Sequence, residues 1–101
     1  MGVRFGEKEF GKSFFVSFVQ FKKEIESMGF EISETNIVDI DLMEMKTNMG
    51  TIIKFVPIEI MNPKLSEGVR IFVDNIKSKN SGTLPQFQYL DFRYGNKIFY
   101  K

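Results

Sequence analysis

The 101-residue chain contains neither cysteine nor histidine. Without cysteine it can form no disulfide and no thiolate-bound metal centre, and without histidine it lacks the commonest general base and zinc ligand. Serine–histidine and cysteine–histidine nucleophile systems are therefore excluded. This composition points away from catalysis. We expect a protein that is not an enzyme and that has no catalytic residue, no cofactor and no bound metal.

An excess of one charge and long apolar runs are also absent from the sequence. Its 14 lysines and arginines nearly balance 13 aspartates and glutamates, so no basic excess favours nucleic acid as a partner. No run reaches the roughly 18 apolar residues of a membrane span, and the start lacks the layout of a signal peptide. We expect any membrane anchor to lie outside this chain, and residues 1–101 to form one domain.

Two segments carry apolar residues at helical spacing. The first runs from Ser13, a suitable N-cap, to Gly29, a suitable C-terminal stop. The second opens with Asn62 as N-cap and Pro63 at the first helical position, and Gly68 weakens it by about 1 kcal/mol relative to alanine. The predicted buried faces comprise Phe14, Phe18, Phe21, Ile25 and Met28 in the first helix, and Leu65, Val69, Phe72, Val73 and Ile76 in the second.

Between the helices, apolar and polar residues alternate as they do in strands. Val38, Ile40 and Leu42 alternate with Asp39 and Asp41, which predicts a strand with both aspartates on one solvated face. The alternation slips after Leu42, and this indicates a bulge or a turn at that point.

Two hairpins complete the predicted sheet. Residues 43–56 form the first and turn at Asn48-Met49-Gly50, and residues 87–94 and 97–101 form the second around Gly95-Asn96. We interpret residues 2–10 as a loose lead-in. The predicted fold class is α+β, with a mostly antiparallel sheet, two amphipathic helices packed on one face, and a C-terminal β-hairpin.

Three aspartates raise the alternative of a small metal-dependent enzyme domain. Asp39 and Asp41, side by side on a strand, could bind a hard cation or act as acid and base, with Asp91 as a further carboxylate. A third ligand near the first two is missing, and a solvated strand face explains them better. Asp91 and Arg93 share a strand face, where a surface ion pair contributes at most about 1 kcal/mol.

The last predicted strand, residues 97–101, is expected at an edge of the sheet. An exposed edge is a template for another chain's strand. The alternative is a short edge protected from such pairing by Lys97 and Lys101. Aromatic residues around this hairpin could also stack on bases, but the balanced charge argues against nucleic acid.

The segment Tyr89-Leu90-Asp91-Phe92-Arg93-Tyr94-Gly95-Asn96-Lys97-Ile98 resembles the Asp-Leu-Arg-Tyr segment near the end of the FtsQ/DivIB bacterial cell-division proteins. The resemblance extends through the element order over roughly residues 10–101. Phe92 stands where the family usually has leucine, and Val56-Pro57-Ile58 replaces the family's Leu-Gly step and basic residue. The resemblance implies the C-terminal part of an extracytoplasmic β domain.

The resemblance also implies a function. In that family the domain is a non-enzymatic divisome scaffold in septum formation, and its last strand accepts a strand from FtsB (DivIC in other bacteria), in complex with FtsL. The full protein has one helix in the bacterial cell membrane, here outside the chain, with this domain on the extracytoplasmic side. An envelope or secretion assembly adaptor is the alternative. The implied partner-binding residues are Tyr94, Lys97, Ile98, Phe99 and Tyr100, and the motif residues are Asp91, Arg93, Gly95 and Asn96.

Overall fold

The computed structural model describes residues 3–5, 8–95 and 97–101, and side chains from residue 11 onward within these ranges. It has the α+β fold that the sequence predicts, with two long helices and a five-stranded, mostly antiparallel sheet. In chain order the elements are β1 (Val3–Phe5), β2 (Lys8–Phe10), α1 (Lys12–Ser27), β3 (Ile32–Asp39), β4 (Leu42–Thr47), β5 (Ile52–Phe55), the 3-10 helix η1 (Pro57–Met61), α2 (Pro63–Lys79), β6 (Tyr89–Tyr94) and β7 (Lys97–Tyr100).

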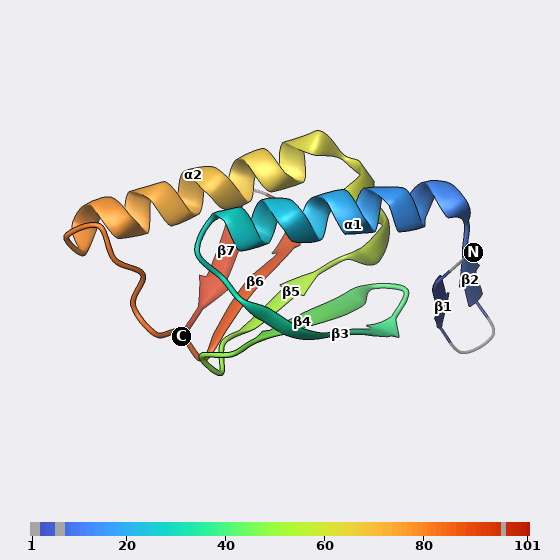
Figure 1. Cartoon of the computed structure of the whole chain (residues 1–101), viewed down its shortest axis with the longest axis horizontal. Coiled ribbons are helices and arrows are strands. Elements are labelled where there is room, and N and C mark those ends of the chain that lie inside the picture. Colours follow the sequence, from blue (N-terminus) through green and yellow to red (C-terminus); the bar gives the residue numbers. More distant parts are fainter. Residues whose placement is uncertain (1–2, 6–7, 96) are drawn as a thin grey trace.

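The main sheet has the strand order β3-β4-β5-β6-β7, and both helices lie on one face of it (Figure 1). Neighbouring strands are antiparallel except β5 and β6, which are parallel. The parallel pair arises because η1 and α2 carry the chain from one end of β5 back to the start of β6. The sheet therefore has one face covered by helices and one open face, with β3 and β7 as its two edges.

The helix boundaries follow from local capping chemistry. Asn62 caps α2 as predicted, because its side chain accepts a hydrogen bond from the Lys64 amide at 3.0 Å. The predicted Ser13 cap is wrong: α1 begins at Lys12 with Gly11 as its N-cap, and the Gly11 carbonyl accepts the Phe15 amide. Gly29 follows the end of α1 with a φ of 111°, as the glycine signal predicts.

One lysine near the end of α2 has a partner that the sequence did not reveal. The Lys77 ammonium donates to the Met28 carbonyl at the C-terminal end of α1, at 2.8 Å. A cation at this position satisfies a carbonyl that the helix leaves without an intrahelical donor. The contact ties the C-terminal ends of the two helices together.

The core lies between the helices and the covered face of the sheet. Phe55 at its centre makes a T-shaped contact with Phe21 of α1, with ring centroids 4.8 Å apart, and stacks on Phe92 of β6 at 5.5 Å. Phe72 of α2 packs edge-on against Phe92 at 5.7 Å. Such pairs add about 0.5–1.5 kcal/mol each to the free energy of burial. They join both helices to the middle of the sheet.

The predicted strand at residues 38–42 is wrong in its boundaries and its facing. Strand β3 ends at Asp39, and β4 begins at Leu42, so the chain turns between them. Val38 and Ile40 are exposed, because the alternation crosses a turn and does not follow one strand. The bulge or turn predicted after Leu42 is misplaced: the turn lies at Ile40 and Asp41, and the register shift lies between Ile37 and Asp39.

The two ends of the chain differ from prediction to different degrees. Strands β1 and β2 pair antiparallel in the segment expected to be a loose lead-in, and they lie beyond the start of α1 (Figure 1). Residues 1, 2, 6 and 7 lie outside the described residues. The C-terminal hairpin forms as predicted from β6 and β7, with Gly95 at a φ of 65° in the turn. Asn96, the other predicted turn residue, lies outside the described part of the chain.

Candidate functional site

Strand β7 lies at one edge of the sheet, which agrees with the predicted position of the last strand. It pairs with β6 alone, and among the described residues no strand pairs with its outer side. The ladder continues past β7, because the Lys101 carbonyl accepts the Gln88 amide at 2.6 Å and the Lys101 amide donates to the Tyr89 carbonyl at 3.3 Å. The edge therefore extends over residues 97–101.

The direction of the backbone groups along this edge follows from the ladder. In an antiparallel pair, alternate residues turn their N–H and C=O groups toward the partner strand. Lys101 bonds toward β6, so Phe99 does the same, and Ile98 and Tyr100 turn their backbone groups outward. Ile98 and Tyr100 thus each present one backbone donor and one acceptor to an incoming strand.

On the helix-covered side of β7, Tyr100 and Ile98 border the core. Tyr100 contacts Phe72 and Phe87, with ring centroids 5.7 and 5.6 Å away, but its side chain remains 53% exposed. Ile98 packs against the core cluster and is half-buried. This side of the edge is apolar and incompletely covered.

On the open side, Phe99 and Tyr94 form an exposed aromatic pair. Their rings meet edge-on at 5.3 Å, and each side chain is about half exposed, at 50% and 51%. They border an open cavity of about 510 Å³ that Lys54, Tyr89, Asp91 and Lys97 also line. Exposed aromatic rings beside an unpaired edge offer apolar area to a partner at little cost in side-chain entropy.

Asp91 forms the floor of this open side and is not the surface residue that the sequence predicted. It is only 5% exposed, and Arg93 donates a hydrogen bond to each of its carboxylate oxygens, from Nε at 2.9 Å and from Nη2 at 2.8 Å. The Arg93 amide adds a third hydrogen bond at 3.1 Å. Arg93 also donates to the Tyr94 hydroxyl at 3.1 Å and thereby orients that ring. Asp91 and Arg93 thus fix the side chains of β6, the strand that pairs with β7.

The pKa of Asp91 reflects opposing effects. Burial alone would raise it, but the hydrogen bonds from Arg93 and the charges of Arg93 and Lys54 outweigh burial and hold the pKa below its ordinary value of 3.8. The hydrogen bond to Asp91 likewise raises the pKa of Arg93. Both groups are therefore charged at neutral pH, and the bidentate pair is a fixed structural element.

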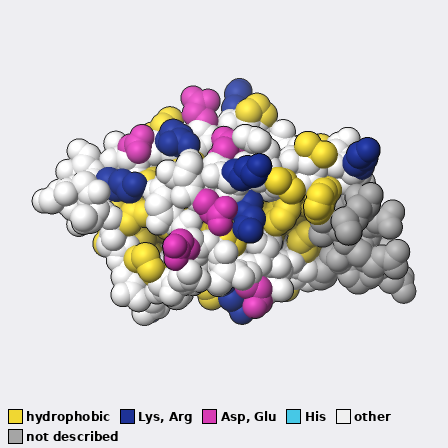
Figure 2. All heavy atoms as spheres, viewed as in Figure 1, with side chains coloured by type: hydrophobic (Ala, Val, Ile, Leu, Met, Phe, Trp, Pro, Cys, Tyr) yellow, Lys and Arg dark blue, Asp and Glu magenta, His cyan; other side chains and the backbone are white. Residues whose placement is uncertain are grey.

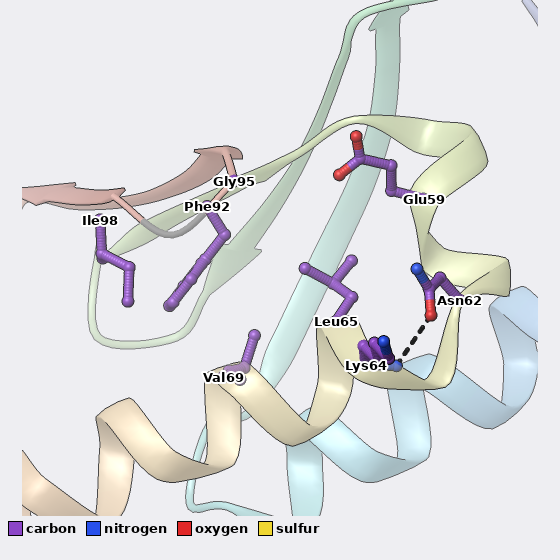
Figure 3. A pocket seen from close by; sticks show the side chains of 9 residues that line it. Glu59, Asn62, Lys64, Leu65, Val69, Phe92, Gly95 and Ile98 are labelled. Carbon is purple, nitrogen blue, oxygen red and sulfur yellow. Dashed lines mark hydrogen bonds between the residues drawn. The ribbon is translucent and has the colours of Figure 1, made fainter.

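A second cavity, of about 360 Å³, lies on the helix side beside β7. Figure 3 shows Leu65 and Val69 of α2 facing Phe92 and Ile98 across it, so its interior is apolar. Polar groups stand at the rim, where the Asn62 side chain is held by its bond to the Lys64 amide (Figure 3). Further lining residues are Glu59, Gly68 and Gly95.

The opposite edge, β3, has a different character. Its ladder to β4 is interrupted by register shifts between Ile32 and Glu34 and between Ile37 and Asp39. Glu34 on this strand lies 3.7 Å from Lys46 and accepts a hydrogen bond from Asn36. Bulges and charged side chains are the devices by which natural sheets discourage pairing at an edge.

Asp39 and Asp41, the candidate metal ligands, do not share a strand face. Asp39 closes β3, where its carboxylate accepts the Ile40 amide at 2.6 Å, and Asp41 lies in the turn that follows. Asp91 lies on β6, three strands away in the sheet order. Within the described residues, no three carboxylates gather as a metal site would require. The arrangement on which the metal hypothesis depended is therefore absent from this part of the chain.

The helix-covered face presents a mixed surface. Figure 2 shows lysine, arginine and acidic side chains interspersed over the two helices, with apolar side chains between them. The exposed apolar residues of α1 and η1 are Val16, Val19, Ile58 and Met61. None of the helices in the described ranges is long and apolar enough to cross a membrane.

No family model matches the sequence, and no curated protein matches it significantly. The geometry of the edge therefore carries the functional argument.

The structure brings most of the predicted site residues together. Tyr94, Lys97 and Phe99 line the open-side cavity, and Ile98 lines the helix-side one. Sequence reasoning missed Lys54, which forms a cation–π contact with Tyr89 at 5.2 Å, and did not assign the α2 residues Leu65 and Gly68 to the site. The position of Gly68 within a helix was a signal, because glycine there weakens the helix unless its lack of a side chain has a use.

Proposed function

We propose that this chain is a non-enzymatic scaffold domain that binds a partner by β-strand addition along the outer side of β7. The observation that carries the proposal is the combination of unpaired backbone groups at Ile98 and Tyr100 with exposed aromatic rings on both sides of the same strand. Main-chain hydrogen bonds would supply affinity, and the alternating side chains would supply specificity.

The resemblance of residues 89–98 to the FtsQ/DivIB segment supports a specific partner. We propose that the chain is the C-terminal part of an FtsQ/DivIB-like β domain on the extracytoplasmic side of the bacterial cell membrane, and that it acts in septum formation. Its partner is then an FtsB- or DivIC-like division protein in complex with an FtsL-like protein. The resemblance and the geometry point to the same strand by independent routes.

The test replaces a β7 residue by proline at a position where the lost backbone N–H could bond only to an added strand. The Ile98 amide faces away from β6, so Ile98→Pro removes an outward donor and keeps the internal ladder. We expect this variant to bind the extracytoplasmic segment of the FtsB- or DivIC-like protein from the same genome at least about tenfold more weakly in calorimetry, or about 1.4 kcal/mol. Deletion of residues 97–101 should abolish binding.

Two matched variants control this test. Ile98→Val keeps the amide and most of the side chain and should bind like the parent. Thr35→Pro removes an outward amide at the opposite edge: the Thr47 amide bonds toward β5, so alternation turns Thr35 away from β4. It should also leave binding unchanged. Full affinity in Ile98→Pro with a retained fold would overturn the proposal.

A further inference from the structure

The helix-side cavity beside β7 contains an unfilled position on α2. Gly68 lines the cavity, and a Cβ built on it would meet no atom within 4 Å. Alanine would therefore fit the fold and would strengthen the helix. The glycine leaves open a space whose other walls are Leu65, Val69, Phe92 and Ile98.

We infer that this cavity receives one large apolar side chain from the strand added to β7, and that Gly68 keeps the space open for it. The inference rests on the proposed function, because it places the occupant on the added strand. It assigns a binding pocket to the α2 side of the edge and names the chemistry that the pocket selects.

The pleat of the sheet determines which partner residue reaches the cavity. Residues directly opposite each other in neighbouring strands point to the same face, with Cβ atoms about 4.5–5.5 Å apart. Ile98 points to the helix side and lines the cavity. The residue that pairs with Ile98 through its outward amide and carbonyl therefore projects beside it, toward α2.

The size and lining of the cavity select an apolar side chain. Its volume of about 360 Å³ lies near the lower end of the range of ligand pockets, about 300–1,000 Å³, and leaves room for a bulky side chain. The walls named above offer carbon atoms, whereas the Asn62 side chain is already engaged with the Lys64 amide. A polar residue placed against these apolar walls, away from Glu59 and Lys64, which also line the cavity, would lose water without gaining a partner.

Charge complementarity argues for an acidic partner strand and against a second copy of this chain. Lys54 and Lys97 line the open-side cavity, where the Asp91 carboxylate is already held by Arg93, and Glu44 of β4 lies opposite Lys54. Two β7 strands paired antiparallel about Phe99 would set Lys97 opposite Lys101, and like charges in that relation destabilise a sheet. A heterologous strand with acidic residues at alternate positions avoids this repulsion.

The experiment uses a blocked synthetic peptide, Thr-Glu-Thr-Glu-Leu-Glu-Thr-Glu, in which a single leucine supplies the apolar side chain. It is titrated into the isotope-labelled domain while amide signals are followed by NMR. We expect shifts at Ile98 and Tyr100 from strand addition and at Leu65, Gly68 and Val69 from filling of the cavity. Replacing the leucine by alanine should weaken binding about fivefold, and replacing the glutamates by lysine should weaken it further.

A filled cavity provides the decisive variant. Gly68→Leu should bind the leucine peptide at least about fivefold more weakly, about 1 kcal/mol by the affinity scale, and bind the alanine peptide as the parent does. Gly68→Ala serves as the fold control and should raise the Tm by about 4–8 °C. A Gly68→Leu variant that binds the leucine peptide at full strength would overturn the inference.

The outcomes separate this inference from the proposed function. Shifts at β7 with equal affinity for the leucine and alanine peptides would leave strand addition intact and remove the role of the cavity. No shift at β7 with any peptide up to about 5 mM, which corresponds to a binding free energy weaker than about 3 kcal/mol, would overturn the inference. Calorimetry with the native partner segment would still decide the proposed function.

Discussion

The two edges of the sheet, β3 and β7, differ in nearly every feature that controls pairing. Strand β3 is longer, carries Glu34 and Asn36, and is interrupted by register shifts near both ends. Strand β7 is short and pairs with a buried strand, and it carries exposed Phe99 and Tyr100. One edge resists an added strand, and the other is suited to receive one.

The two edges differ in the burial of the residues that hold them in the sheet as much as in their surface chemistry. Three successive residues of β6, the strand behind β7, are buried: Leu90, Asp91 and Phe92. The residues of β3 are half-buried or exposed along its whole length. A rigid template loses less conformational entropy when a partner binds, because its geometry is already fixed. The comparison predicts that changes behind β7 have large effects and changes at β3 have small ones.

The largest expected effect comes from removing the ring behind β7. Phe92→Ala deletes the side chain that stacks on Phe55 and meets Phe72, so the free energy of unfolding should fall by about 3–5 kcal/mol. Ile37→Ala, at a half-buried position of β3, should cost only about 1–2 kcal/mol. Chemical denaturation measures both values. Equal losses would show that the two edges have equal support.

The next effect concerns the ion pair beneath the open side of β7. Asp91→Asn leaves Arg93 without its carboxylate, and unfolding free energy at pH 7 should fall by about 2 kcal/mol. The folded-state pKa of Asp91 lies below 3.8. The parent's larger free energy of unfolding is therefore fully present above that pH and is lost as the pH falls through the folded-state pKa. Denaturation from pH 7 to pH 2 should show the two curves converging. A difference that stays constant across this range would contradict the role of the charge.

The smallest expected effect is on self-association. Lys97→Thr removes the charge that opposes pairing between two copies of β7, and Glu34→Thr is the matched change at β3. Both variants should keep unfolding free energy within about 0.5 kcal/mol of the parent. In sedimentation at high protein concentration, only Lys97→Thr should show a dimer. Dimers of Glu34→Thr and not of Lys97→Thr would reverse the comparison.

Elements defined by local chemistry were predictable from the sequence. Asn62 and Pro63 start α2 and Gly29 follows α1, because caps and glycine act on the residues beside them. The alternation at residues 38–42 was misleading, because Asp39 turns its carboxylate onto the next amide and thereby forms a turn. Val38 and Ile40 continue the apolar pattern in the sequence, but their side chains are exposed and do not join the core.

The position of the site in the sheet was predictable from the sequence, but the tertiary contacts around it were not. The edge position of β7 followed from the hairpin pattern, but the lowered pKa of Asp91 depends on hydrogen bonds from Arg93 and on the charge of Lys54, which lies on a strand distant in the sequence. The helix-side cavity likewise needs α2 placed over β6 and β7. Such features arise from tertiary packing, which a pattern of periods two and 3.6 does not encode.

The central claim is that β7, and not β3, receives the partner strand, and amide hydrogen exchange tests it most directly. The domain is exchanged alone and with the extracytoplasmic segment of the FtsB- or DivIC-like protein from the same genome. The account predicts slowed exchange at Ile98 and Tyr100, whose amides face outward, and unchanged exchange at Thr35. Protection at Thr35, or binding without protection at Ile98 and Tyr100, would contradict it.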